Sequence, residues 1–176
     1  MDTTSIIQWN VQGIHQRKDE ILELSKSFQA SIIAAQETFL WENSNFKIPN
    51  FNCLRKDGHF NVRAHGGVAL FIRENIPYKE ITLSTTLTAI AAQITINSTF
   101  TICNIYLPPS STIDRTLFQN LYQQLPQPCL IVGDFNAHNP LWDYTRQNPD
   151  QRGNIIENFI NSKNLILLNN GDPTRI

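Results

Sequence analysis

Between residues 66 and 106 the sequence passes through four strand-like stretches with no helical stretch between them. Each is rich in β-branched or aromatic residues, which is typical of strands; the stretches are 66–74, 78–83, 87–97 and 99–106. Asn97–Ser98 is the expected turn of a hairpin. Consecutive strands of this kind argue against a pure doubly wound sheet. They favour an α+β fold in which sheets pack together and helices lie outside.

The rest of the chain supplies further strands and three helices. Strands are predicted at 5–11, 30–37, 129–132 and 165–169, with one more near 51–55. Apolar residues recur on one helical face at 17–28, 113–125 and 154–164, so these stretches are predicted to be amphipathic helices. Ser111 is the expected N-cap of the second helix, with Asp114 three residues later.

Composition indicates a single globular domain, residues 1–176, with 41% hydrophobic and 16% charged residues. The formal net charge of −1 does not point to a polyanionic partner. A bound divalent metal and a few placed cations can nevertheless neutralise a phosphate locally. The sequence shows no signal peptide and no run approaching the roughly 20 apolar residues of a membrane span. We therefore expect no membrane partner and a nuclear or cytoplasmic location.

Polar residues of catalytic types stand where four apolar strands end. These are Asn10, Glu37, Tyr106, and the pair Asp134 and Asn136. Each alone is ordinary turn or surface chemistry. Alternation along an extended chain would put Asp134 and Asn136 on one face and Phe135 in the core, and Asn10 and Gln12 would likewise share a face. Together the two carboxylates, two carboxamides and one phenol predict a site of hard oxygen ligands, which suits Mg²⁺ or Mn²⁺.

Four segments, in this order, resemble the motifs of the endonuclease/exonuclease/phosphatase superfamily, the family of deoxyribonuclease I and exonuclease III. They are WNVQG (9–13), AAQET (34–38), NIYLPPSS (104–111) and GDFNAHNPLW (133–142). The finer resemblance is to the apurinic-type endonuclease domain of non-LTR retrotransposons, in which an Arg-Gly like Arg152–Gly153 follows, and then a helix and a strand like LILLNNGDPTRI (165–176). The resemblance implies a four-layer α/β/β/α sandwich of two mainly antiparallel sheets.

The resemblance also implies an activity: hydrolysis of a phosphodiester in double-stranded DNA with Mg²⁺, for which Mn²⁺ often substitutes. In the parent polyprotein a reverse transcriptase domain would follow. By position in the motifs, Glu37 matches the metal-ligand carboxylate and Asn10 the amide of the metal and phosphate site. Asp134 matches the acid that orients or deprotonates the attacking water. Asn136 and Tyr106 match groups that contact the phosphate.

Three more residues are candidate substrate contacts. A His like His138 recurs in the retrotransposon branch, where structural, DNA-binding and chemical roles all stay open. Arg152 is expected either to form a salt bridge at the helix start or to touch a phosphate. Gln12 stands where abasic-site repair enzymes of this family carry Asp, which favours the mobile-element branch over a repair role.

The family pattern continues with a further Asp and a Ser-Asp-His that this sequence, ending at Ile176, does not contain. We therefore expect a fragment that lacks the last strands of the second sheet and has impaired activity. Two alternatives stay open beside the nuclease. One is a phosphatase of the same fold acting on small phosphoesters, and the other is a binding module or catalytically dead relic.

Overall fold

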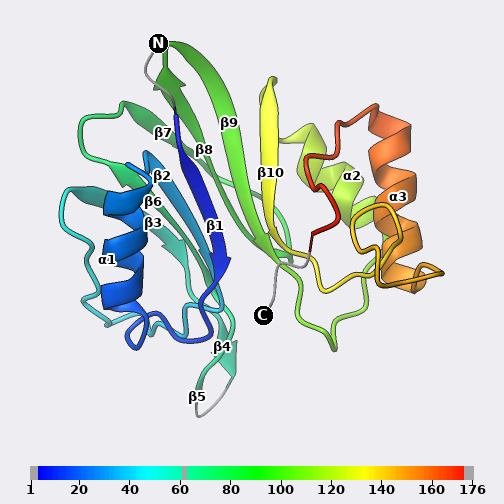
Figure 1. Cartoon of the computed structure of the whole chain (residues 1–176), viewed down its shortest axis with the longest axis horizontal. Coiled ribbons are helices and arrows are strands. Elements are labelled where there is room, and N and C mark those ends of the chain that lie inside the picture. Colours follow the sequence, from blue (N-terminus) through cyan, green and yellow to red (C-terminus); the bar gives the residue numbers. More distant parts are fainter. Residues whose placement is uncertain (1–3, 61–62, 173–176) are drawn as a thin grey trace.

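The computed structural model describes residues 4–60 and 63–172, and it forms four layers (Figure 1). One sheet has the strand order β1-β2-β6-β3 and the other β10-β9-β8-β7. Helix α1 (Lys18–Ser27) covers the outer face of the first sheet, while α2 (Arg115–Gln123) and α3 (Gln151–Lys163) cover the second. The α/β/β/α sandwich expected from the resemblance is therefore confirmed.

Both sheets combine parallel and antiparallel pairs. The first contains β1 (Ile6–Asn10), β2 (Ile32–Gln36), β3 (Phe51–Lys56) and β6 (Val68–Arg73). The second contains β7 (Tyr78–Ile81), β8 (Thr88–Ile96), β9 (Ser98–Tyr106) and β10 (Cys129–Asp134). Only the pairs β1–β2 and β9–β10 are parallel among the strand pairs of these two sheets in the described chain. In each sheet the C-terminal ends of two neighbouring strands, here called the strand exits, therefore lie side by side.

Three apolar clusters fill the three spaces between the four layers, because strand side chains alternate between faces. In β2, Ile33 and Ala35 pack toward α1, while Ile32 and Ala34 face the second sheet. In β9, Cys103 and Ile105 pack toward α2 and α3. Tyr106 belongs to the cluster between the sheets, with less than a tenth of its surface exposed. The inter-sheet core therefore reaches up to the strand exits.

Most predicted elements are present within a few residues of their expected bounds, including the hairpin at Asn97, whose φ is +54°. The second helix is capped by Asp114, whose side chain accepts from the Thr116 N–H, so the predicted cap at Ser111 is wrong. Ser111 instead donates to the Pro108 carbonyl at 2.8 Å. Helix α3 begins three residues earlier than expected because Asp150 caps it by accepting from the Gly153 N–H at 2.6 Å.

The strand expected at 165–169 does not form. Residues 165–170 belong to no strand, although their exposure alternates as in a strand, with Ile166 and Leu168 exposed and Leu165 and Leu167 half-buried. Residues 173–176, the end of the last motif, lie outside the described part of the chain. A small hairpin of β4 (His59–Phe60) and β5 (Arg63–Ala64) was not predicted.

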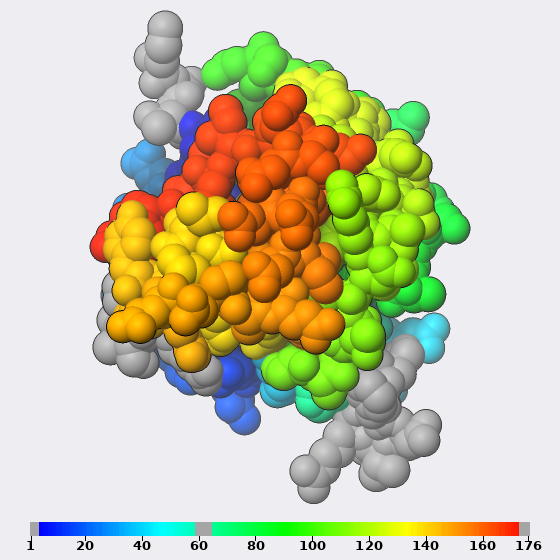
Figure 2. Space-filling model, turned by 90° about the vertical axis from the view of Figure 1, so that its right-hand side faces the viewer, coloured from blue at the N-terminus to red at the C-terminus, as the bar shows by residue number. Residues whose placement is uncertain are grey.

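In residues 4–60 and 63–172, no helix is both long enough and apolar enough to cross a membrane. The face in Figure 2 is covered by α2, α3 and the long loop between β10 and α3, which lie side by side.

Candidate active site

The predicted site residues meet at the lower end of the sandwich in Figure 1, where the two pairs of parallel strands end. Asn10 ends β1 opposite Gln36, so it lies beside Glu37. Asp134 ends β10 opposite Tyr106, the last residue of β9. Strands β1 and β10 contact each other across the two sheets. The strand exits of both sheets therefore form one site, as the sequence predicted.

The Asn10 amide connects the two carboxylates of the site. Its Nδ2 donates to Glu37 Oε1 at 2.7 Å and to Asp134 Oδ2 at 2.6 Å. Glu37 directly follows β2 of the first sheet, and Asp134 ends β10 of the second. The Asn10 amide therefore joins the two sheets at the end where these strands stop. Hydrogen bonds to a charged acceptor are short and strong. Asn10 thereby holds two negative groups close together in spite of their mutual repulsion.

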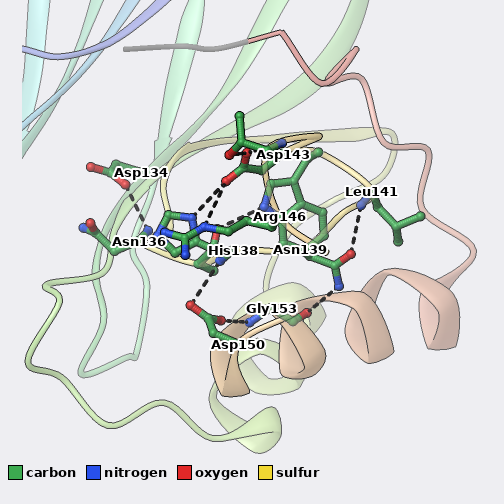
Figure 3. A network of polar contacts seen from close by, with 12 residues as sticks. Asp134, Asn136, His138, Asn139, Leu141, Asp143, Arg146, Asp150 and Gly153 are labelled. Atoms are coloured by element: carbon green, nitrogen blue, oxygen red, sulfur yellow. Dashed lines mark hydrogen bonds and ion pairs between the residues drawn. The ribbon is translucent and has the colours of Figure 1, made fainter. Parts of the chain in front are cut away.

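Asp134 and Asn136 do lie next to each other, but through a turn and not through strand alternation (Figure 3). Strand β10 ends at Asp134, and Asn136 has a φ of +45°. The Asn136 N–H donates to Asp134 Oδ1 at 2.9 Å, and its Nδ2 donates to the Leu107 carbonyl at 3.0 Å. Phe135 packs into the outer core, 6.4 Å from the Phe118 ring in a stacked arrangement. Phe135 therefore packs against the core as expected, but its side chain is only half-buried.

Left-handed backbone is concentrated around the site. Four non-glycine residues there have positive φ, namely Gln12, Glu37, Phe39 and Asn136. Such residues cost about 1–3 kcal/mol each and persist only where the surrounding structure holds them. For Glu37 the consequence is direct, because its φ of +50° ends the alternation of β2 and turns the carboxylate away from the α1 face. The side chain can therefore reach Asn10 and Tyr106.

Tyr106 closes the inner wall of the site. Its side chain is 1% exposed, and a Cβ added at Gly66 would lie 3.3 Å from its ring. Burial raises the pKa of the Tyr106 phenol well above its ordinary value, and the charge of Glu37, a hydrogen bond with Glu37 and the charge of Asp134 raise it further. The positive charge of Arg152 opposes this shift. Tyr106 is therefore a protonated hydrogen-bond donor throughout the neutral range.

This pKa shift predicts a pH dependence of stability. The unfolded chain loses the Tyr106 proton near pH 10.0, whereas the folded chain keeps it to higher pH. The stabilising contribution is therefore complete below pH 10.0 and is lost as the pH rises through the folded pKa. Above pH 10.0 the unfolding free energy of the parent protein is expected to fall as the pH rises. In Tyr106→Phe this fall is expected to be less steep, by the slope that one proton contributes. Urea unfolding at a series of pH values measures both slopes. Equal slopes would contradict the shift, since the Cys103 thiol, whose pKa burial raises to about 12, titrates in both proteins.

Gln12 and His138 lie at the exposed rim. Gln12 does not share a strand face with Asn10, because β1 ends at Asn10; its N–H donates to Asn10 Oδ1 at 3.3 Å. His138 follows Asn136 by two residues, and its Nδ1 lies 3.1 Å from Asp143 Oδ2 (Figure 3). Hydrogen bonds from Thr145 and then from His138 lower the pKa of Asp143. The loop therefore holds the His138 ring in a defined orientation beside the site.

Arg152 does not form the expected salt bridge among the ion pairs of the described residues. Its guanidinium spans the loops that follow β9 and β10. It donates to the Pro108 carbonyl at 2.6 Å, to the Pro109 carbonyl at 3.1 Å and to the Ser111 carbonyl, and to the Phe135 carbonyl at 3.3 Å. Arg152 thus ties together the loop that follows Tyr106 and the loop that carries Asn136.

The site carries the kind of ligand atoms that a hard divalent cation binds. It offers oxygen donors only: the carboxylates of Glu37 and Asp134 and the amide oxygen of Asn10. No group of three or more His, Cys, Asp or Glu side chains forms a metal cage within the described chain. A site with few protein ligands is typical for Mg²⁺, since this ion binds through one or two carboxylates and keeps several waters or substrate oxygens. The oxygen atoms of Glu37, Asp134 and Asn10 therefore fit a divalent metal.

The sequence reading missed two residues next to the site, Gln36 and Asn104. Both are completely buried amides, Gln36 at the end of β2 and Asn104 two residues before the end of β9. A carboxamide in the middle of a run such as FTICNIY was the available signal, because a buried polar side chain needs specific partners.

Residues 100–176 match the protein family described as "Endonuclease-reverse transcriptase". The RNA-directed DNA polymerase from mobile element jockey of Drosophila melanogaster is 22% identical over 175 residues, which cover 98% of this chain and 19% of that protein. The probable RNA-directed DNA polymerase from transposon BS of the same species is 25% identical, over 99% of this chain and 20% of that protein. The chain thus spans about a fifth of the length of these curated relatives.

Solved structures share the fold. The endonuclease domain of TRAS1, a telomere-specific non-LTR retrotransposon, superposes with a TM-score of 0.76 at 17% identity, covering 96% of this chain and 76% of that one. An AP endonuclease from Archaeoglobus fulgidus gives a TM-score of 0.58 at 18% identity, covering 91% and 71%. In its family match over residues 100–176, its curated relatives and its fold, the chain is similar to the endonuclease domains of non-LTR retrotransposons.

Proposed function

We propose that this chain is a divalent-metal-dependent phosphodiesterase, the DNA-nicking domain of a non-LTR retrotransposon polyprotein. Its substrate would be double-stranded DNA, and hydrolysis would leave a 3′-hydroxyl that a linked reverse transcriptase extends. The curated relatives are named as RNA-directed DNA polymerases, which supports the linked domain. Such a protein would act in the nucleus, where its target DNA lies.

The observation that carries the proposal is the bridge of Asn10 between Glu37 and Asp134. It brings two carboxylates from different sheets to one point, with the Tyr106 phenol buried beside them. Packing alone gives no reason to gather like charges at a strand end. A site that binds a metal and directs a water at a phosphate needs this arrangement.

We assign the protein groups as follows. Asp134, fixed by the Asn10 amide and the Asn136 N–H, orients the attacking water and accepts its proton. Tyr106 donates a hydrogen bond to a phosphoryl oxygen, and the Asn136 amide contacts the same phosphate. The water oxygen forms the new bond to phosphorus while the bond to the leaving 3′-oxygen breaks, and that oxygen takes a proton from solvent water and leaves as a hydroxyl. Bound at Glu37 and Asn10, Mg²⁺ or Mn²⁺ would supply positive charge for the phosphate oxygens and the leaving group.

The rim residues receive lesser roles in this proposal. His138 and Gln12 are exposed beside the site and are proposed to contact the DNA backbone. Arg152 is occupied by loop carbonyls, and we propose that it acts on the phosphate only through its charge and through the loops that it holds.

The test is nicking of a supercoiled plasmid by the purified chain in Mg²⁺ or Mn²⁺, with Glu37→Ala beside it. Removing a metal ligand is expected to abolish nicking or to lower its rate by at least about 10²-fold. Glu42→Ala is the matched control, because Glu42 is exposed on the following loop and is expected to leave the rate unchanged. Equal nicking by the parent protein and Glu37→Ala would refute the proposal.

A second candidate is a phosphatase of the same fold. The mannosyl-6-phosphatase Bt3783 of Bacteroides thetaiotaomicron superposes with a TM-score of 0.60 at 15% identity, covering 91% of this chain and 71% of that one. Release of phosphate from small phosphoesters without any nicking of plasmid would favour this candidate. Failure of both reactions in either metal would favour the relic.

A further inference from the structure

Two buried amides connect the sheets directly beneath the site. Asn104, in β9 of the second sheet, donates through Nδ2 to the Ala35 and Ala69 carbonyls of the first sheet, both at 2.9 Å. Its Oδ1 accepts from Gln36 Nε2 at 2.6 Å. Gln36 Oε1 in turn accepts from Gln8 Nε2 of β1 at 2.6 Å. Both amides are 0% exposed, so this is a satisfied polar network inside the inter-sheet core.

The surroundings of the Gln36–Asn104 pair are apolar. The same space contains Ile and Leu side chains from both sheets, among them Leu70 of the first and Ile94 and Ile102 of the second. Apolar contacts are not directional. They oppose pulling the two sheets apart, but they oppose a small sliding of one sheet along the other much less. Hydrogen bonds between buried amides have narrow distance and angle limits. The pair therefore fixes how far one sheet is offset from the other.

This offset matters because the site is divided between the sheets. Gln36 directly precedes Glu37, whose carboxylate belongs to the first sheet's half of the site. Asn104 precedes Tyr106 by two residues, so both side chains lie on one face of β9, about 7 Å apart along the strand. In the β9–β10 ladder, Asn104 pairs with Val132 and Tyr106 pairs with Asp134. Any shift at Asn104 thus moves Tyr106 and Asp134 relative to Glu37.

We propose that Gln36 and Asn104 are positioning residues for hydrolysis, which set the distance between Glu37 on one sheet and Tyr106 and Asp134 on the other. The proposal rests on the proposed function. It predicts that the pair contributes to the rate of the chemical step and to metal affinity, and not to DNA binding, because neither amide reaches the surface.

The decisive variant is the double change Gln36→Met with Asn104→Leu, which keeps both shapes and removes both polar groups. The change removes both partners of the Gln36–Asn104 bond, which is nearly neutral for stability. The buried Ala35 and Ala69 carbonyls lose the Asn104 donor, however, so a lower Tm than in the parent protein is expected. The kcat for plasmid nicking is expected to fall roughly 10- to 100-fold, the effect of a small misplacement of reacting groups. KM for DNA should stay unchanged, and the Mn²⁺ concentration for half-maximal nicking should rise.

Ile94→Val is the matched control, since Ile94 is equally buried in the same inter-sheet cluster. It is expected to lower Tm by a few degrees without changing kcat. If the double variant does not fold, Gln36→Met alone keeps both Asn104 bonds to the first sheet, and a smaller loss of kcat is expected. Parental kcat in either folded variant overturns the inference.

A second readout separates this inference from the proposed function. If Mn²⁺ binds at the site, it is expected to raise the Tm of the parent protein, because a ligand of the folded state stabilises it. The rise is expected to be smaller in the double variant and unchanged in Ile94→Val. If the parent protein neither nicks DNA nor shows a higher Tm with Mn²⁺, the proposed function itself is wrong. This outcome is recognised from the parent protein alone, without any variant.

Discussion

Replacing Asp134 by Asn is expected to lower the nicking rate by about 10²- to 10⁴-fold, the usual contribution of a general base. The substitution keeps the size of the side chain and one acceptor oxygen. Two donors, the Asn10 amide and the Asn136 N–H, now share the Asp134 carboxylate. An amide can satisfy only one of them, so a stability loss of about 1–2 kcal/mol is expected. Single-turnover nicking at saturating metal, together with urea unfolding, measures both effects.

Asp114→Asn is the control for this change. Asp114 is an exposed helix cap that accepts from the Thr116 N–H at 2.9 Å, and Asn caps helices about as well as Asp does. Its rate and stability should equal those of the parent. If Asp134→Asn nicks DNA within about threefold of the parent rate, the role of Asp134 as water-orienting base is wrong, because general-base catalysis contributes far more than that.

Replacing Arg152 by Met is expected to cost about 3 kcal/mol of unfolding free energy, because hydrogen bonds from a charged donor contribute about 1.5–3 kcal/mol each and are not additive. The guanidinium holds the loops after β9 and β10, and these loops also meet through the bond from Asn136 Nδ2 to the Leu107 carbonyl. Met keeps the aliphatic stem and removes every donor. Chemical unfolding measures the loss, and nicking should weaken as Asn136 becomes less well held.

Two companion variants test this account of Arg152. Arg152→Lys keeps the charge but not the planar set of donors, so it should recover only part of the stability. Arg17→Met removes an exposed arginine that pairs with Glu20 at 2.8 Å, with both side chains about half exposed, and such surface pairs contribute at most about 1 kcal/mol. Equal losses in Arg17→Met and Arg152→Met would show that the loop contacts contribute little.

Local patterns predicted most of the fold. The consecutive strands of 66–106 excluded a doubly wound sheet, and the helices at 17–28 and 113–125 followed from apolar periodicity. The strand predicted at 165–169 was wrong, because alternating side chains indicate an extended chain but a strand also needs a neighbour for its backbone hydrogen bonds. The cap at Asp114 in place of Ser111 likewise depended on where the chain between β9 and α2 was held.

The sequence by itself determined which residues stand at the strand ends, and its motifs predicted that Asn10, Glu37, Tyr106, Asp134 and Asn136 lie close together. Only the tertiary structure decided how they meet. Left-handed backbone at Glu37 and Asn136 redirects both side chains, which no strand alternation predicts. Arg152 turns out to hold loops, and Gln36 and Asn104 to join the sheets, because the partners of a polar side chain are distant in sequence and appear only when the layers pack.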